Sequence, residues 1–175
     1  MAEHRMRRRI DLRRSAATGA LLALLVGCAA VPPPSTPAGL PLGSTEAQVI
    51  ARMGQPTGRY QLPQGGTRLE FARGPQGRET YMVDFDAKGG SILWEQVLTP
   101  QTFLSLQSGM STEEVLMRIG HPGSTRDFPR QQLWVWNYRY PTFDCLWYQV
   151  SIGYDGKFIG AANTTDPQCD KPTRL

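Results

Sequence analysis

The chain has 175 residues, of which 40% are hydrophobic and 19% are charged, and its formal net charge is +4. Residues 1–27 carry six of the 19 Lys and Arg residues and two of the 15 Asp and Glu residues, which leaves 13 of each sign in the remainder. Because the remainder is close to neutral, the composition gives no reason to expect a nucleic-acid-binding protein.

The N-terminus has the pattern of a secretory signal. Six arginines accompany an apolar stretch at 16–26, which is shorter than the roughly 20 apolar residues of a membrane-spanning helix. Residues 25–28, Leu-Val-Gly-Cys, resemble the lipobox of bacterial lipoproteins, in which the signal is removed and the cysteine is acylated. We therefore expect residues 1–27 to be a lipoprotein signal peptide and Cys28 to be a palmitate-bearing lipidation site. An ordinary cleaved signal near Ala29 and an uncleaved anchor are the alternatives.

Lipidation at Cys28 predicts a location. More than one acyl chain attaches a protein durably to a membrane. In the lipoprotein class that the lipobox indicates, an aspartate after the cysteine tends to retain the protein in the inner membrane, and this chain has Ala29 there. We expect a lipid-anchored protein of the outer membrane that faces the periplasm. Residues 28–42 include five prolines and predict an extended tether.

The remaining residues, about 130, are enough for one compact domain with a core. They contain a tandem repeat, since residues 43–56 and 109–122 share one design at a constant spacing of 66 residues. Each copy ends in Gly-x-Pro. Two similar supersecondary units are therefore expected side by side.

Each copy of the motif predicts a short capped helix. Thr45 and Ser111 have hydroxyls that cap a helix N-terminus, and Gln48 and Glu114 complete a capping box three residues later. The closing glycine ends the helix, and the following proline prevents its continuation. An apolar stripe is formed by Val49, Ile50 and Met53 in the first copy and by Val115, Leu116 and Ile119 in the second.

Alternating apolar and polar residues predict strands after each helix, and Thr99 with Pro100 predicts one more short helix between the units. Phe85 and Asp86 match Tyr154 and Asp155 at a spacing of 69, which implies about three extra residues in the second unit. The predicted strands are 67–71, 80–85 and 91–98 in the first unit, and 133–140, 146–154 and 157–161 in the second.

The fold class predicted is α+β, with one or two short helices on a small antiparallel sheet in each of two tandem units. The units are residues 43–98 and 99–161, and residues 162–175 form a C-terminal tail.

The repeated pattern Gly-x-[Ser/Thr]-x-x-[Glu/Gln]-Val, followed by Gly-x-Pro and an aromatic strand behind a lipobox, resembles the SmpA/OmlA (BamE-like) outer-membrane lipoprotein family. The resemblance covers residues 43–161 as two copies. It implies an accessory of the machinery that folds β-barrel proteins into the outer membrane, with another envelope protein as its partner. Tandem units of this design also resemble the β-lactamase inhibitor protein architecture, so a binder or inhibitor of a periplasmic enzyme is the alternative.

Two cysteines follow Cys28. In an oxidising periplasm, Cys145 and Cys169 most simply form a disulfide that pins the tail, although two free buried thiols are the alternative. So few cysteine and histidine ligands argue against a metal site.

The sequence predicts no enzyme, because no catalytic motif is visible. After residue 27, His121 is the only histidine, and Gln55 occupies its place in the first copy, so we expect a solvated turn residue. Asp84 and Asp86 indicate turn chemistry at a hairpin. We expect no cofactor, no small-molecule substrate and no catalytic residue.

The candidate partner-binding residues are aromatic: Trp134, Trp136, Tyr138 and Tyr140 alternate along one strand, and Trp147 lies on the next. If Leu69 and Phe71 match Trp136 and Tyr138, the alternating aromatics are core; a match to Val135 and Asn137 turns them outward. We favour core packing, because burial stabilises large apolar side chains. Trp147 has the opposite parity to its apolar neighbours and is the best candidate for exposure.

Overall fold

The computed structural model describes residues 36–169. The predicted signal peptide, the predicted lipidation site Cys28, most of the predicted tether and the end of the tail lie outside these residues. Within the described part of the chain, no helix is both long and apolar enough to span a membrane.

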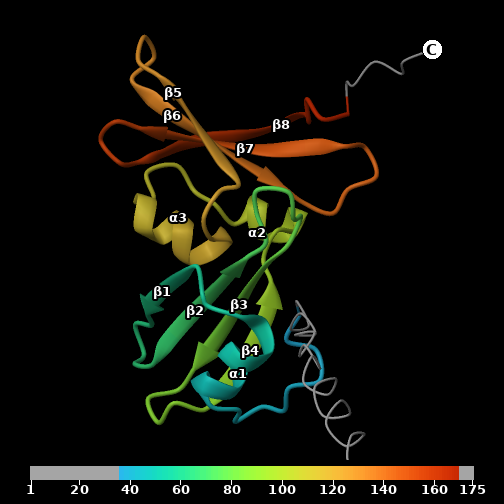
Figure 1. The fold of residues 1–175 in the computed structure, drawn as a ribbon. Helices are drawn as coiled ribbons and strands as arrows, with labels where there is room; N and C mark the ends of the chain where they lie inside the picture. Colours follow the sequence, from blue (N-terminus) through green and yellow to red (C-terminus); the bar gives the residue numbers. More distant parts are fainter. Residues whose placement is uncertain (1–35, 170–175) are drawn as a thin grey trace, which may run out of the picture. The chain divides into compact units, whose positions relative to one another are not determined.

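The α+β class predicted from the sequence is confirmed. The described residues form two four-stranded antiparallel sheets, each in the order of the sequence, and three short helices (Figure 1). The elements are α1 (Glu46–Met53), β1 (Gly58–Gln61), β2 (Thr67–Ala72), β3 (Thr80–Phe85), β4 (Ser91–Gln96), α2 (Pro100–Leu104), α3 (Thr112–Ile119), β5 (Ser124–Phe128), β6 (Leu133–Arg139), β7 (Leu146–Gly153) and β8 (Phe158–Thr165).

Helices α1 and α3 are the two copies of the repeated motif, and both begin and end as predicted. Complete capping boxes join Thr45 to Gln48 and Ser111 to Glu114. The closing glycines, Gly54 and Gly120, have φ of 86° and 75°, a backbone conformation that L side chains rarely adopt. The helix between the units is confirmed too, because α2 begins at Pro100 after an N-capping Thr99.

The strands differ from the prediction in three respects. Strands β1 and β5 lack a clear apolar alternation and were not predicted. The last strand, β8, extends to Thr165 and not to Ala161. The spacing of 69 is wrong: Tyr81 and Phe71 pair in the first sheet as Tyr148 and Tyr138 do in the second, which is a spacing of 67 and one extra residue.

The helix α3 contacts both sheets, and this arrangement determines which sheet faces are covered. One face of the first sheet packs on α1 through Val49 and Met53, and its other face meets Leu116 and Met117 of α3. The opposite stripe of α3, Val115 and Ile119, packs on the second sheet (Figure 1).

Burial along the strands follows from these layers. All six residues of β3, in the middle of the first sheet, are buried because both faces of that sheet are covered. In β7 of the second sheet, buried residues alternate with partly exposed ones. The second sheet therefore has one core face and one open face.

Candidate functional site on the open face of the second sheet

The alternating aromatics of β6 face the core. Trp136 pairs with Val150, and Tyr138 with Tyr148, as Leu69 pairs with Val83 and Phe71 with Tyr81 in the first sheet. The alignment with one inserted residue is thereby confirmed. Tyr138 and Tyr140 are only 1% and 6% exposed, so their candidacy as partner-binding residues is wrong. Their rings stabilise the core and are inaccessible to a partner.

The hydroxyls of these tyrosines are satisfied inside the protein. Tyr138 donates to the carbonyl of Gly120 at 2.9 Å, and the Tyr140 hydroxyl donates to Asn163 Oδ1 at 3.2 Å. Burial raises the pKa of Tyr138 well above its ordinary value, which keeps the hydroxyl protonated.

The two tryptophans of the same row lie nearer the surface. Trp136 is half-buried against the core cluster, whereas Trp134, at the start of β6, is 38% exposed. The Trp134 ring packs on Tyr154, with 4.5 Å between the ring centroids. Of the four alternating aromatics, Trp134 is the one that a partner can reach most readily.

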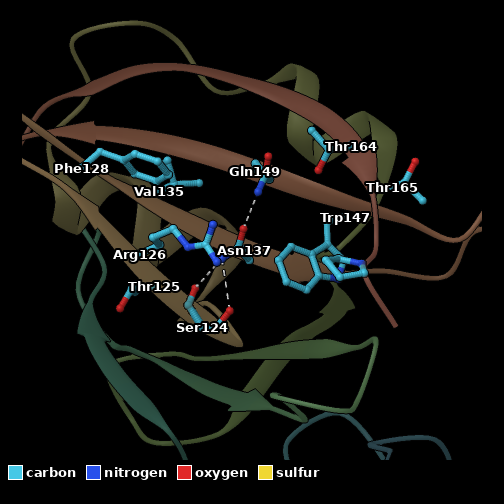
Figure 2. Close-up of a pocket in the computed structure, with 11 residues that line it drawn as sticks. Ser124, Thr125, Arg126, Phe128, Val135, Asn137, Trp147, Gln149, Thr164 and Thr165 are labelled. Atoms are coloured by element: carbon cyan, nitrogen blue, oxygen red, sulfur yellow. Dashed lines mark hydrogen bonds between the residues drawn. The ribbon is translucent and has the colours of Figure 1, made fainter. Parts of the chain in front are cut away.

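The open face carries the residues of opposite parity, including Val135, Asn137 and Arg139 of β6 and Trp147 and Gln149 of β7. All of these except Arg139 line a hollow of about 390 Å³ together with residues of β5 and β8 (Figure 2). In Figure 2, Arg126 lies on one side of Asn137 and Trp147 on the other.

A row of polar side chains crosses the strands at the floor of this hollow. Asn137, 8% exposed, donates from its amide to Ser124 Oγ at 3.2 Å and accepts from Gln149 Nε2 at 2.7 Å. These bonds fix the Asn137 amide between its two neighbours. Gln149 has no other hydrogen-bond partner within residues 36–169, so its amide oxygen is available to a ligand.

Arg126 gives the hollow its positive charge. Its side chain is exposed on β5 and has no hydrogen-bond or ion-pair partner among residues 36–169. Arg139, by contrast, is paired with Asp166 at 2.5 and 3.2 Å. An exposed guanidinium beside a polar floor and an indole ring suits a carboxylate or a peptide carbonyl on a partner.

Trp147 lies on the open face, as its parity predicted, but it is half-buried and Trp134 is more exposed, so the prediction that Trp147 is the best candidate for exposure is wrong. The guanidinium carbon of Arg139 lies 5.1 Å from the ring centroid. Burial opposes ionisation of Asp166, but hydrogen bonds from Arg139 and from the N–H of Gln168 prevail and lower the pKa of Asp166. The ion pair between Arg139 and Asp166 therefore positions the Trp147 ring at the edge of the hollow.

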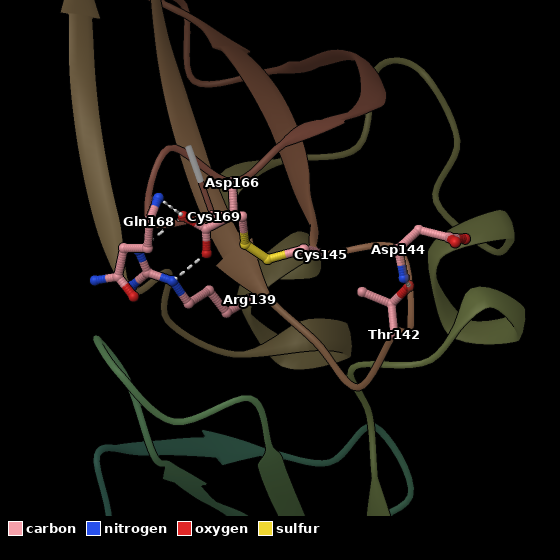
Figure 3. Close-up of a disulfide and its surroundings, with 7 residues drawn as sticks. All are labelled: Arg139, Thr142, Asp144, Cys145, Asp166, Gln168 and Cys169. Carbon is pink, nitrogen blue, oxygen red and sulfur yellow. Dashed lines mark hydrogen bonds and ion pairs between the residues drawn. A yellow bond between two sulfur atoms is a disulfide. The ribbon is translucent and has the colours of Figure 1, made fainter. Parts of the chain in front are cut away.

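A disulfide braces the loop beside this ion pair. Cys145 and Cys169 are joined, with 6.4 Å between their Cα atoms, and the N–H of Asp166 donates to the carbonyl of Cys145 (Figure 3). In the same loop, between β6 and β7, the side chain of Phe143 is fully exposed at 107%. Phe143 was not among the predicted binding residues, although a phenylalanine in a turn without apolar alternation was a usable signal.

The region around His121 differs from the solvated turn that the sequence predicted. His121 Nδ1 lies 2.8 Å from Glu70 Oε2, and the His121 N–H donates to Glu70 Oε1 at 2.9 Å. The carboxyl of Glu70 is fully buried and also accepts from Tyr60 at 2.6 Å and from Thr57 at 2.8 Å. His121, whose side chain is 49% exposed, thus joins the second unit to the first.

Asp84 is also corrected. Its carboxylate pairs with Arg68 at 2.6 and 2.8 Å and is 7% exposed, so it is a buried ion pair and not a turn residue. Asp86 does have the predicted turn role, because it accepts from the N–H groups of Lys88 and Gly90. Glu70 and Asp84 were unrecognised as buried because α3 of the other unit and the loop that follows it cover them.

In comparisons with known proteins, no family model matches the chain, and no curated protein or solved structure matches it. Within residues 36–169, no group of three or more His, Cys, Asp or Glu side chains is placed to hold a metal ion. We take the open face of the second sheet as the candidate site, because it has an open hollow, polar groups available to a ligand and an aromatic ring held in place by its neighbours.

Proposed function

We propose that the chain is an outer-membrane lipoprotein, anchored through acylated Cys28 and facing the periplasm. In this proposal it is a non-catalytic accessory in outer-membrane protein assembly or envelope maintenance, with two tandem BamE-like units. The lipobox-like residues 25–28 support the anchor, and the repeated capped-helix motif supports the family resemblance.

The open face of the second sheet is the single observation that carries the binding role. The first sheet is covered on both faces at its middle strand β3, whereas the second presents Arg126, Gln149 and Trp147 around a hollow. Tryptophan and arginine dominate the energetics of protein interfaces. Since Arg139 already positions the Trp147 ring, a partner meets it at little cost in side-chain entropy.

Binding or inhibition of a periplasmic enzyme is the second candidate, and Phe143 favours it. A fully exposed phenylalanine in a loop beside a disulfide suits insertion into an apolar pocket of another protein. The alternating aromatics of β6 give no support to this second candidate, because Tyr138 and Tyr140 are buried.

Isolation of the lipidated protein from membranes under mild crosslinking tests the proposal. We expect subunits of the barrel-assembly machinery to be recovered with it, and recovery to fall in Arg126→Glu. Arg130→Glu is the matched control, because Arg130 is also exposed but does not line the hollow. Enrichment of a soluble periplasmic enzyme in place of those subunits would support the inhibitor reading, and Phe143→Ala should then abolish recovery.

A further inference from the structure

Strand β8 is an edge of the second sheet with an unpaired outer side. Phe158 exchanges backbone hydrogen bonds with Met110 and Gly109, but β8 has no further backbone partner on that side within residues 36–169. A bulge shifts the register near Ile159, and Gly160 to Thr165 then pair regularly with β7. Every second residue of that run therefore directs its N–H and C=O groups away from the sheet.

The other sheet edges have features that discourage pairing with another chain, and β8 lacks them. Strand β1 has four residues, β4 contains Glu95, and β5 contains Arg126 and Asp127. The eight residues of β8 include no charged residue and no proline, and 161–165 are exposed. Long, uncharged edges are templates for strand addition.

The open face beside β8 has room for large side chains. By register, Gly160 lies next to Ser151 and Ala162 next to Gln149, so small residues form the margin of the face there. Thr164, next to Trp147, lines the hollow itself. A strand added beside β8 would have alternate side chains on this face, above the small residues and within reach of Gln149 and Trp147.

We propose that the β8 edge binds an extended segment of a partner polypeptide by β-augmentation, with one row of apolar side chains over Gly160 and Ala162. Main-chain hydrogen bonds supply the affinity. The small residues leave room for large side chains and so determine which row of side chains of the added strand lies on this face. This inference rests on the proposed function and names the ligand: a not-yet-folded barrel strand, in which apolar and polar residues alternate.

The test uses the full-length chain in detergent micelles and a fluorescent peptide of about nine residues, the length of a barrel strand, in which valine and threonine alternate. Fluorescence anisotropy measures binding, and empty micelles are the blank. Two further peptides carry N-methyl groups on the odd or on the even residues, which removes the N–H donors of one edge only. We expect one methylated peptide to lose binding and the other to keep it; no difference between the two would overturn the proposal.

A variant of the protein, in place of a modified peptide, tests the same β8 edge. Ala161→Lys places a charge on β8 and should abolish peptide binding, whereas Gln61→Lys, of the same charge on the β1 edge, should not. Circular dichroism checks that both variants are folded. Light scattering that shows a dimer lost in Ala161→Lys would assign the edge to a second copy and overturn the proposal. Failure of peptide binding with barrel-assembly subunits still recovered would refute this inference and leave the proposed function standing.

Discussion

Removal of the Glu70 carboxyl should uncouple the two units. This carboxyl is fully buried and takes part in four hydrogen bonds, two of them with His121 of the second unit. Burial and the bond to Glu70 raise the pKa of Tyr60, so its hydroxyl remains the donor. Glu70→Ala leaves these groups without their partner at a position where Glu70 itself is fully buried.

The expected loss in the free energy of unfolding follows from the removal of a buried hydrogen-bonding partner. Breaking a buried, hydrogen-bonded pair by deleting one member costs about 3–5 kcal/mol. Glu70→Gln keeps the shape and one acceptor oxygen, so we expect a smaller loss, about 1.5–3 kcal/mol, as for hydrogen bonds to charged groups. Glu46, whose pair with Arg59 lies at the surface, is the control, and Glu46→Ala should cost less than about 1 kcal/mol.

Urea unfolding followed by tryptophan fluorescence measures these differences. Trp94 reports on the first sheet, and Trp134, Trp136 and Trp147 report on the second. A separate transition for each unit in Glu70→Ala would show directly that the contact couples them. If Glu70→Ala were no more destabilised than Glu46→Ala, the assignment of Glu70 as the coupling residue would be refuted.

Three further predictions concern the repeat glycines, the ion pair and the disulfide. Gly54→Ala should cost about 1–3 kcal/mol from backbone strain alone, and Gly120→Ala should cost more in the same urea assay, because its Cβ would lie 2.7 Å from Thr80. The pKa of Asp166 lies below its ordinary value of 3.8, so its ionised form stabilises the fold above that pH. The stability advantage over Asp166→Asn should accordingly shrink as the pH falls below 3.8 in pH-dependent melts, and an advantage that stays constant would contradict this. Cys145→Ser opens a bridge with a sequence separation of 24 and should cost about 3 kcal/mol in thermal melts, whereas an unchanged melt would show that the bridge contributes nothing.

The helices and their ends were predictable from the sequence because their signals are local. A capping box spans four residues, and the glycine that ends each helix follows directly in the chain. In β7, alternation also separated the core-facing residues from Trp147, because one face of the strand packs on helices of its own unit.

The contacts between the units were not predictable, because they join residues far apart in the sequence. Glu70 alternates with apolar neighbours and so has the pattern of a solvent-facing strand residue, yet the loop after α3 covers it. The location of the open face was not predictable either, because it depends on the same contacts between the units. Only when α3 is seen between the sheets is it clear that β3 is covered on both faces, whereas β7 has a face available to a partner.

Site-specific photo-crosslinking in cells tests the central claim most directly. A photoreactive residue in place of Thr164, which is exposed at the hollow, probes the open face, and one in place of Gln61, exposed on the first sheet, is the control. The account predicts a crosslink to a barrel-assembly subunit or another envelope protein from position 164 and not from position 61. The same products from both positions, or none from position 164, would contradict the account.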